Sequence, residues 1–90
     1  MNNDRRKQIE DLKSRADDLR QQLETLKGDT QSVLDEEMEY YENMPEAIQN
    51  GEKGEKAQSA IAALDEVTSA LDDIDSAMDS MGDSFDTAAE

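Results

Sequence analysis

Apolar residues form two long runs along this chain, with alternating steps of three and four residues. The first run is Ile9, Leu12, Ala16, Leu19, Leu23, Leu26, Thr30 and Val33, in which Thr30 is the one polar member. The second run is Ala57, Ala60, Leu64, Val67, Leu71, Ile74, Met78, Met81 and Phe85. Such steps place side chains on one stripe of a helix, at the a and d positions of a heptad repeat. A disordered acidic chain has no reason to keep this register, so the pattern predicts an all-α protein.

Helix-breaking residues separate the two runs. Pro45 lacks a backbone donor and moves Met44 out of the helical region, so the first helix is expected to end near residue 42. Gly51 and Gly54 are expected to supply the positive φ angles that reverse the chain. The pattern predicts a helix over about residues 5–42, a loop over 43–54 and a helix over about 55–82.

Two local features refine these limits. Asn43 precedes Glu46 by three residues, the spacing of a capping box, and predicts a short turn of helix through Ile48. Gly28 falls at an outward-facing position of the first helix, where we expect a tolerated defect worth about 1 kcal/mol. A kink at Gly28 is the alternative.

The numbering of the two runs predicts an antiparallel coiled-coil hairpin. Residues that face each other in such a hairpin have numbers with a constant sum, and a sum of 97 pairs an a position with a d position throughout. The loop boundaries, Asn43 and Gly54, give the same sum. The predicted pairs are Leu64 with Val33, Leu71 with Leu26, Ile74 with Leu23, Met78 with Leu19, Met81 with Ala16 and Phe85 with Leu12.

Charged residues beside this stripe agree with the same alignment. Lys13, Arg20 and Lys27 occupy successive e positions of the first helix, and Asp75 is expected near Arg20. At the open end, bases at positions 5–7 return beside Asp83, Asp86 and Glu90. The chain is thus predicted to form a single domain over residues 1–90, with 83–90 as a frayed acidic tail.

A two-helix stripe leaves its outer side in water, so the hairpin is expected to need a partner. Ala63, Ala70 and Ala77 lie at successive g positions and widen the apolar stripe of the second helix. We expect a homodimer that forms a four-helix bundle. The alternative is a marginal monomer that another protein completes.

Near the loop the strict repeat fails, because Glu37 takes an a position. Apolar side chains shift there by four residues, which locally unwinds a coiled coil. The first interpretation is an exposed apolar patch that binds a protein, and the second is a closed cap packed against the loop. The candidate patch comprises Leu34, Met38, Tyr41, Met44, Ile48 and Ile61.

Twenty-four acidic residues against nine basic ones give a net charge of −15. The carboxylates of the second helix form a candidate acidic face for a basic protein surface, or a face that only keeps the chain soluble. The charge density argues against mimicry of DNA, because duplex DNA carries about one charge per 1.7 Å of its axis and the second helix carries its charges farther apart. The candidate acidic face comprises Asp65, Glu66, Asp72, Asp73 and Asp79.

Composition excludes several kinds of chemistry. The chain has no His and no Cys, so an imidazole or thiolate metal site and a His-activated nucleophile are excluded. Carboxylates with EF-hand-like spacing lack the turn glycine of a calcium loop. We therefore expect no enzyme, cofactor or metal, and no direct nucleic-acid or membrane partner for so acidic a chain. A cytoplasmic location is expected, because no apolar run reaches the roughly 18 residues of a membrane span.

The loop region carries two short motifs, residues 43–46 (NMPE) and 51–54 (GEKG). With the helix that follows, about residues 39–71 resemble small acidic helical proteins of unknown activity predicted in phages and mobile elements. The resemblance implies an inhibitor that binds and blocks a host protein, such as a nucleic-acid-handling or defence protein in the host cytoplasm. The acidic charge of residues 29–90 predicts that the inhibitor binds a basic surface of this target. The hypothesis is a non-enzymatic protein-binding module; the alternative is a self-assembling coiled-coil scaffold.

Overall fold

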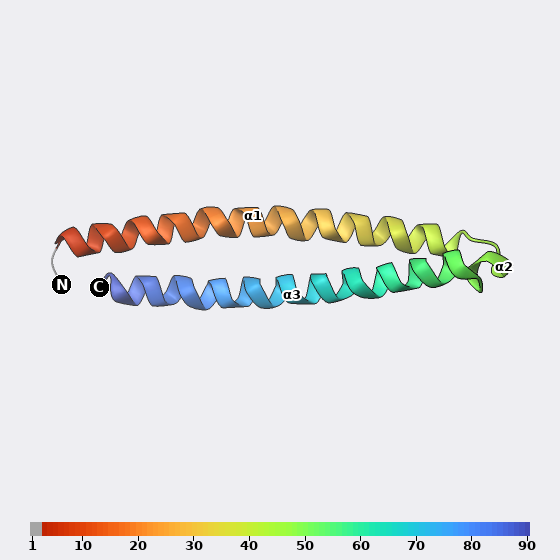
Figure 1. The fold of residues 1–90 in the computed structure, drawn as a ribbon. Coiled ribbons are helices and arrows are strands. Elements are labelled where there is room, and N and C mark those ends of the chain that lie inside the picture. Colours follow the sequence, from red (N-terminus) through yellow and green to blue (C-terminus); the bar gives the residue numbers. More distant parts are fainter. Residues whose placement is uncertain (1–2) are drawn as a thin grey trace.

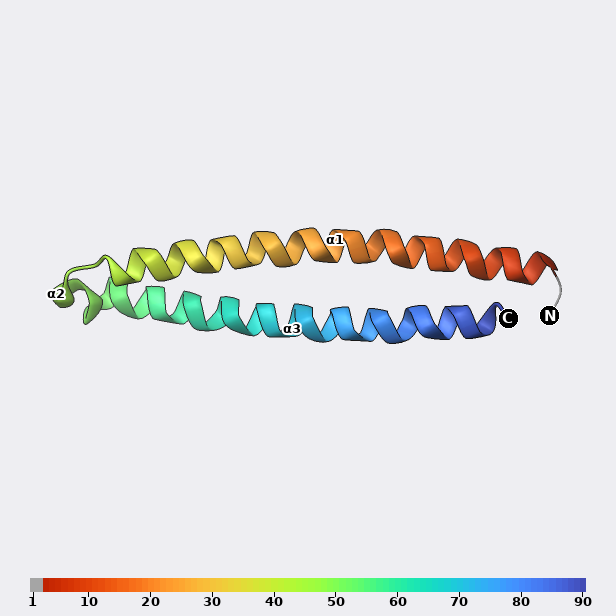
Figure 2. The ribbon, with the colours of Figure 1, turned by 180° about the vertical axis from the view of Figure 1, so that it is seen from behind.

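Two long helices, side by side and antiparallel, make up this protein (Figure 1). The computed structural model describes residues 3–90. Helix α1 spans Asn3–Glu42, α2 spans Glu46–Gln49 and α3 spans Glu52–Ala88. The start of α1 and the end of α3 lie at one end of the hairpin and α2 at the other, as the view from behind also shows (Figure 2). The predicted all-α class and the reversal after residue 42 are confirmed.

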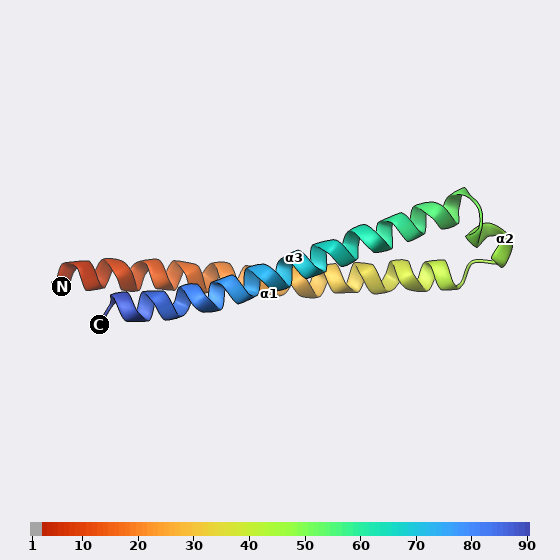
Figure 3. The same ribbon diagram turned by 90° about the horizontal axis from the view of Figure 1, so that it is seen from below.

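The hairpin is long and thin, with extents of 69 × 15 × 13 Å. Seen from below, α3 crosses α1 at a shallow angle near the middle of the molecule (Figure 3). Shallow crossings are typical of helices whose ridges interlock as in coiled coils and bundles. α1 runs unbroken through Gly28, so the helix does not end at this glycine. Gly28 is exposed, as expected for an outward-facing position.

The predicted alignment along the hairpin is confirmed at its centre, but the predicted facing of a positions by d positions was wrong, because Leu26 and Ile74 are 52% and 48% exposed. Leu26 and Leu71 line one hollow between the helices, together with Leu23 and Ile74. Near the open end, Leu12 and Phe85 line a second hollow. Both pairs belong to the alignment whose numbers sum to 97, so the two apolar runs do fold back on each other.

The predicted helix limits change at both ends of α3. The helix begins at Glu52 instead of about residue 55, and it continues to Ala88 instead of about residue 82. Residues 83–90, expected as a frayed tail, are thus helical as far as Ala88. Arg6 of α1 donates a hydrogen bond to the backbone oxygen of Glu90 (3.2 Å), which ties this end to α1.

The chain reverses without the positive φ angles expected from its glycines, so that prediction was wrong. No residue between 3 and 90 has a positive φ, and Gly51 is extended with φ −99° and ψ −167°. Gly54 lies inside α3 and is buried. A Cβ on Gly54 would stand 1.8 Å from the backbone oxygen of Gln49, so the glycine permits α2 to lie directly against α3.

The short helix after Pro45 is confirmed, but the capping box at Asn43 is not. α2 starts at Glu46 with Pro45 as its N-cap and without a side-chain hydrogen bond at the cap. Gln49, the last residue of α2, instead caps the C-terminal end of α1. Its side-chain amide donates a hydrogen bond to the carbonyl oxygen of Tyr41 at 2.9 Å. This bond satisfies one of the carbonyls that a helix end leaves free.

Candidate functional site

Helix α1 is rotated relative to the predicted stripe, so that its a and e positions face α3. Leu23, at an a position, and Leu34, at an e position, are 7% and 5% exposed. The d positions lie on the other side of the a positions and remain open: Leu19 is 55% and Leu26 52% exposed. A contact between only two helices covers about two of the heptad lines, and the sequence alone did not reveal which line stays outside.

Helix α3 shows the same rotation. Its a positions Leu71 and Met78 are buried, whereas Ile74, at a d position, is 48% exposed. The open d positions of the two helices lie on the same side, because Leu19, Leu26 and Ile74 line a single hollow of about 450 Å³. We call this surface the apolar face: Leu12, Leu19, Leu26 and Val33 of α1 with Val67, Ile74 and Met81 of α3, which are between 38% and 55% exposed.

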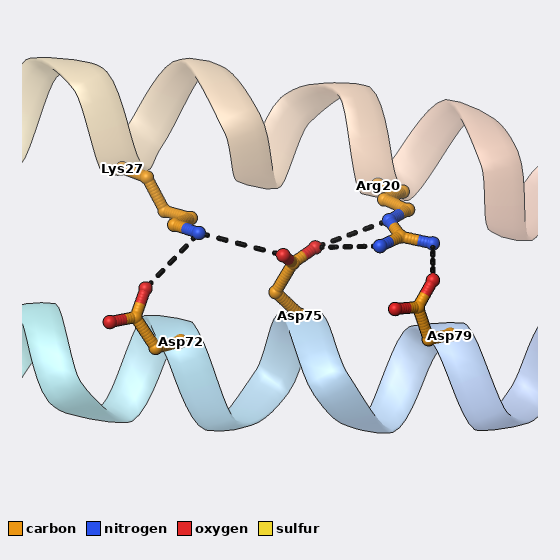
Figure 4. A network of polar contacts seen from close by, with 5 residues as sticks. All are labelled: Arg20, Lys27, Asp72, Asp75 and Asp79. Carbon is orange, nitrogen blue, oxygen red and sulfur yellow. Dashed lines mark hydrogen bonds and ion pairs between the residues drawn. The ribbon is translucent and has the colours of Figure 1, made fainter.

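The opposite side of the hairpin carries a row of cross-helix ion pairs. Asp75 lies between Arg20 and Lys27, 3.1 Å from the guanidinium and 3.5 Å from the ammonium (Figure 4). Arg20 also reaches Asp79 at 2.6 Å, and Lys27 reaches Asp72 at 3.1 Å. This ion-pair ladder, completed by Lys13 with Asp86 near the open end, confirms the expected approach of Asp75 to Arg20.

These contacts shift several pKa values in the direction that favours the charged forms. The hydrogen bond from Arg20 lowers the pKa of Asp79. The hydrogen bonds to Asp86 and to Asp72 raise the pKa of Lys13 and of Lys27, respectively. All of these groups stand at the surface, so the ladder aligns the helices more than it stabilises them.

The ladder uses part of the predicted acidic face. Asp72 and Asp79 belong to it and bridge to α1, instead of pointing away as free carboxylates. Asp65, Glu66 and Asp73 are exposed and form no ion pair with the residues that the structure describes. No cation of α1 lies opposite Asp65 of α3, because the e position that follows Lys27 is Leu34, which is buried.

The predicted apolar patch near the loop is mostly closed. Leu34 is buried, and Tyr41, Met44 and Ile61 are half-buried. Only Met38 and Ile48 stay open, at 40% and 42% exposure. The structure thus favours the interpretation as a closed cap over that of one continuous patch.

A shallow hollow of about 500 Å³ remains at the end of the hairpin where α2 reverses the chain, which we call the hinge end. Met44 and Ile48 line it together with Tyr40, whose side chain is 54% exposed. Glu36 and Glu39 stand on its rim. Tyr40 was not among the predicted site residues, although its d position, seven residues after Val33, continues the apolar face.

Between residues 3 and 90 no three acidic side chains converge as metal ligands. No helix described here is long and apolar enough to cross a membrane. Comparisons of the chain with protein-family models, with curated proteins and with solved structures find no match.

Proposed function

We propose that this chain is a non-enzymatic assembly module that pairs with a second copy of itself through the apolar face. The observation that carries this proposal is the row of seven large apolar side chains, each 38–55% exposed, along one side of both helices. Single exposed apolar residues are ordinary, but a continuous row marks a surface that binds protein. The assembled form is a homodimeric four-helix bundle.

The small core of one hairpin supports the proposal. Five hydrophobic side chains are buried among residues 3–90: Leu23, Leu34, Ala57, Leu71 and Met78. No side chain of this region is completely buried. A second hairpin on the apolar face would turn this single row of contacts into the closed core of a bundle.

The free energies of burial and association favour the same conclusion. Full burial of a Val, Leu, Ile or Met side chain is worth about 1.5–3 kcal/mol, and the seven side chains have about half of that still to gain. Two copies together would gain roughly 10–20 kcal/mol, against an association cost of about 4–15 kcal/mol. The gain is therefore of the size that association requires.

The test is a charge-neutral change on the apolar face, Leu19→Gln with Leu26→Gln. Both positions are half-exposed in the hairpin, so the helices should survive while the dimer dissociates. Sedimentation equilibrium should give the mass of two chains for the wild type and of one chain for the variant. Thr25→Gln with Ser32→Gln, two exposed positions on the outer side of α1, is the matched control and should remain a dimer. A monomeric wild type would refute the proposal.

A second candidate function has its own supporting observation. Asp65, Glu66 and Asp73 are exposed and form no ion pair within residues 3–90, and the hinge-end hollow is rimmed by Glu36 and Glu39. These carboxylates suit a basic protein surface, and the resemblance of residues 39–71 to small acidic phage proteins agrees with an inhibitor of a host protein. Binding of this kind weakens as salt rises, whereas burial of apolar side chains does not.

A further inference from the structure

We infer that the two copies pair with their hinges at opposite ends, so that Arg15 of one copy lies beside Asp29 of the other. This inference rests on the self-association proposed above and adds its direction. A two-fold axis along the hairpin would put both hinges at one end, whereas an axis across the hairpin puts them at opposite ends. Both arrangements bury the apolar face equally well, so the charges decide between them.

The two ends of the hairpin differ in charge. The hinge end, residues 33–64, holds eight acidic and two basic residues, a net charge of −6. The open end, residues 3–16 and 81–90, holds six acidic and five basic residues, a net charge of −1. Hinges at one end would bring −6 against −6, whereas opposed hinges bring −6 against −1, with less repulsion.

The apolar face has a centre about which two copies can be superposed. On α3 the centre is Ile74, which lies midway between Val67 and Met81. On α1 it falls between Leu19 and Leu26, and these residues share one hollow with Ile74. A two-fold axis across this centre lays α1 on α1 and α3 on α3, and all neighbouring helices are then antiparallel.

The side chains that border the apolar face fit this arrangement. On α1 the border follows the g positions and runs from Arg15 through Gln22 to Asp29, so reversal about the centre sets Arg15 against Asp29. Arg15 is 72% exposed, and its contact with Asp11 is long at 3.9 Å, so its guanidinium can turn to a closer carboxylate.

The border of α3 fits as well. There the g positions carry Ala63, Ala70 and Ala77, which are exposed and uncharged, so two copies of α3 can approach closely. With the hinges at one end, Arg15 would instead face Ser84, the uncharged g position of α3 at the same level of the hairpin.

The direction of pairing can be measured by energy transfer between labels on different copies. The chain has no cysteine, so Asn50→Cys at the hinge and Thr87→Cys at the open end can each be labelled specifically. Both positions are exposed. Donor-labelled and acceptor-labelled chains are mixed and allowed to exchange subunits. The control is a mixture of donor-labelled chains with unlabelled chains.

Opposed hinges predict efficient transfer between position 50 of one copy and position 87 of the other, and almost none between two labels at position 50. The reverse result would overturn the inference but leave the proposed dimer intact. Absence of transfer in both mixtures, together with a monomeric mass in sedimentation, would refute the dimer itself.

A charge exchange tests the individual contact. Arg15→Glu and Asp29→Lys, each made alone, put like charges together across the opposed interface. The double variant restores opposite charges and should dimerise about three- to tenfold more tightly than the product of the two single effects predicts. Independent effects of the two changes would contradict the pairing of Arg15 with Asp29.

Discussion

Gly54 shows at the scale of one residue how the hinge is built. Its backbone conformation is helical and open to any residue, but the backbone of Gln49 occupies the space where a side chain would begin. The glycine therefore serves the close approach of α2 to α3 and not the turn itself. Around Gly28, in contrast, no side chain and no other element lies within 4 Å of the place where a Cβ would stand.

These two glycines should respond oppositely to the same substitution. Gly54→Ala forces backbone apart at the hinge and should destabilise the protein by about 1–3 kcal/mol or more. Gly28→Ala, the control, adds a better helix former at an exposed site and should stabilise it by about 1 kcal/mol. Thermal unfolding followed by circular dichroism measures both changes. Equal stability of the two variants would contradict the close packing at Gly54.

At the scale of the helices, the ion-pair ladder fixes how α1 and α3 are rotated about their axes. Arg20 and Lys27 have long side chains whose aliphatic stems cover the edge of the helix contact while their charged ends reach α3. Asp75 binds both cations, so its position ties two sites of α1, about two turns apart, to one turn of α3. Together with the packing of the buried a positions, the ladder leaves the d positions turned outward.

The pH dependence of this ladder has a definite sign. The pKa of Asp79 is lowered by the hydrogen bond from Arg20, so its contribution to stability is present above the ordinary carboxyl pKa of 3.8. This contribution is lost as the pH falls through the lower pKa of the folded state. The variant Arg20→Gln should thus melt a few degrees below the wild type at pH 7, and the difference should shrink at acid pH.

The control is Lys56→Gln, which removes an exposed ion pair within α3 and none between the helices. Its melting temperature should stay close to that of the wild type at both pH values. A difference between Arg20→Gln and the wild type that persists unchanged in acid would show that Asp79 does not contribute through its charge.

At the scale of the whole molecule, a net charge of −15 opposes self-association through the apolar face. The carboxylates outside the ladder, such as Asp65 and Glu66, are exposed and do not belong to that face, so repulsion acts over a distance that salt can screen. The dimer should therefore be strengthened by salt, unlike a complex with a basic partner.

This expectation can be measured on the wild type alone. Raising the salt concentration from about 0.1 M to about 1 M shortens the screening length from about 10 Å to about 3 Å. The dissociation constant of the dimer, followed by sedimentation equilibrium, should fall severalfold. The variant Leu19→Gln with Leu26→Gln should remain monomeric at both concentrations. A dissociation constant that rises with salt would show that attraction between charges holds the copies together.

The amino-acid sequence by itself determined the helices, the place of the hinge and the alignment of the two runs. These features depend on local rules: heptad spacing sets the stripes, Pro45 ends α1, and the numbering places Leu26 at the level of Leu71. The expected closeness of Arg20 and Asp75 follows from the same alignment.

Only the tertiary structure decided which apolar residues stay outside. The stripe of α3 is wider than one neighbouring helix can cover, so the sequence allowed either flank of Leu71 to face α1. Packing and the ladder together selected the flank with Asp75 and left Ile74 exposed. The role of Gly54 was hidden for the same reason, because contact with Gln49 arises only when α2 folds onto α3.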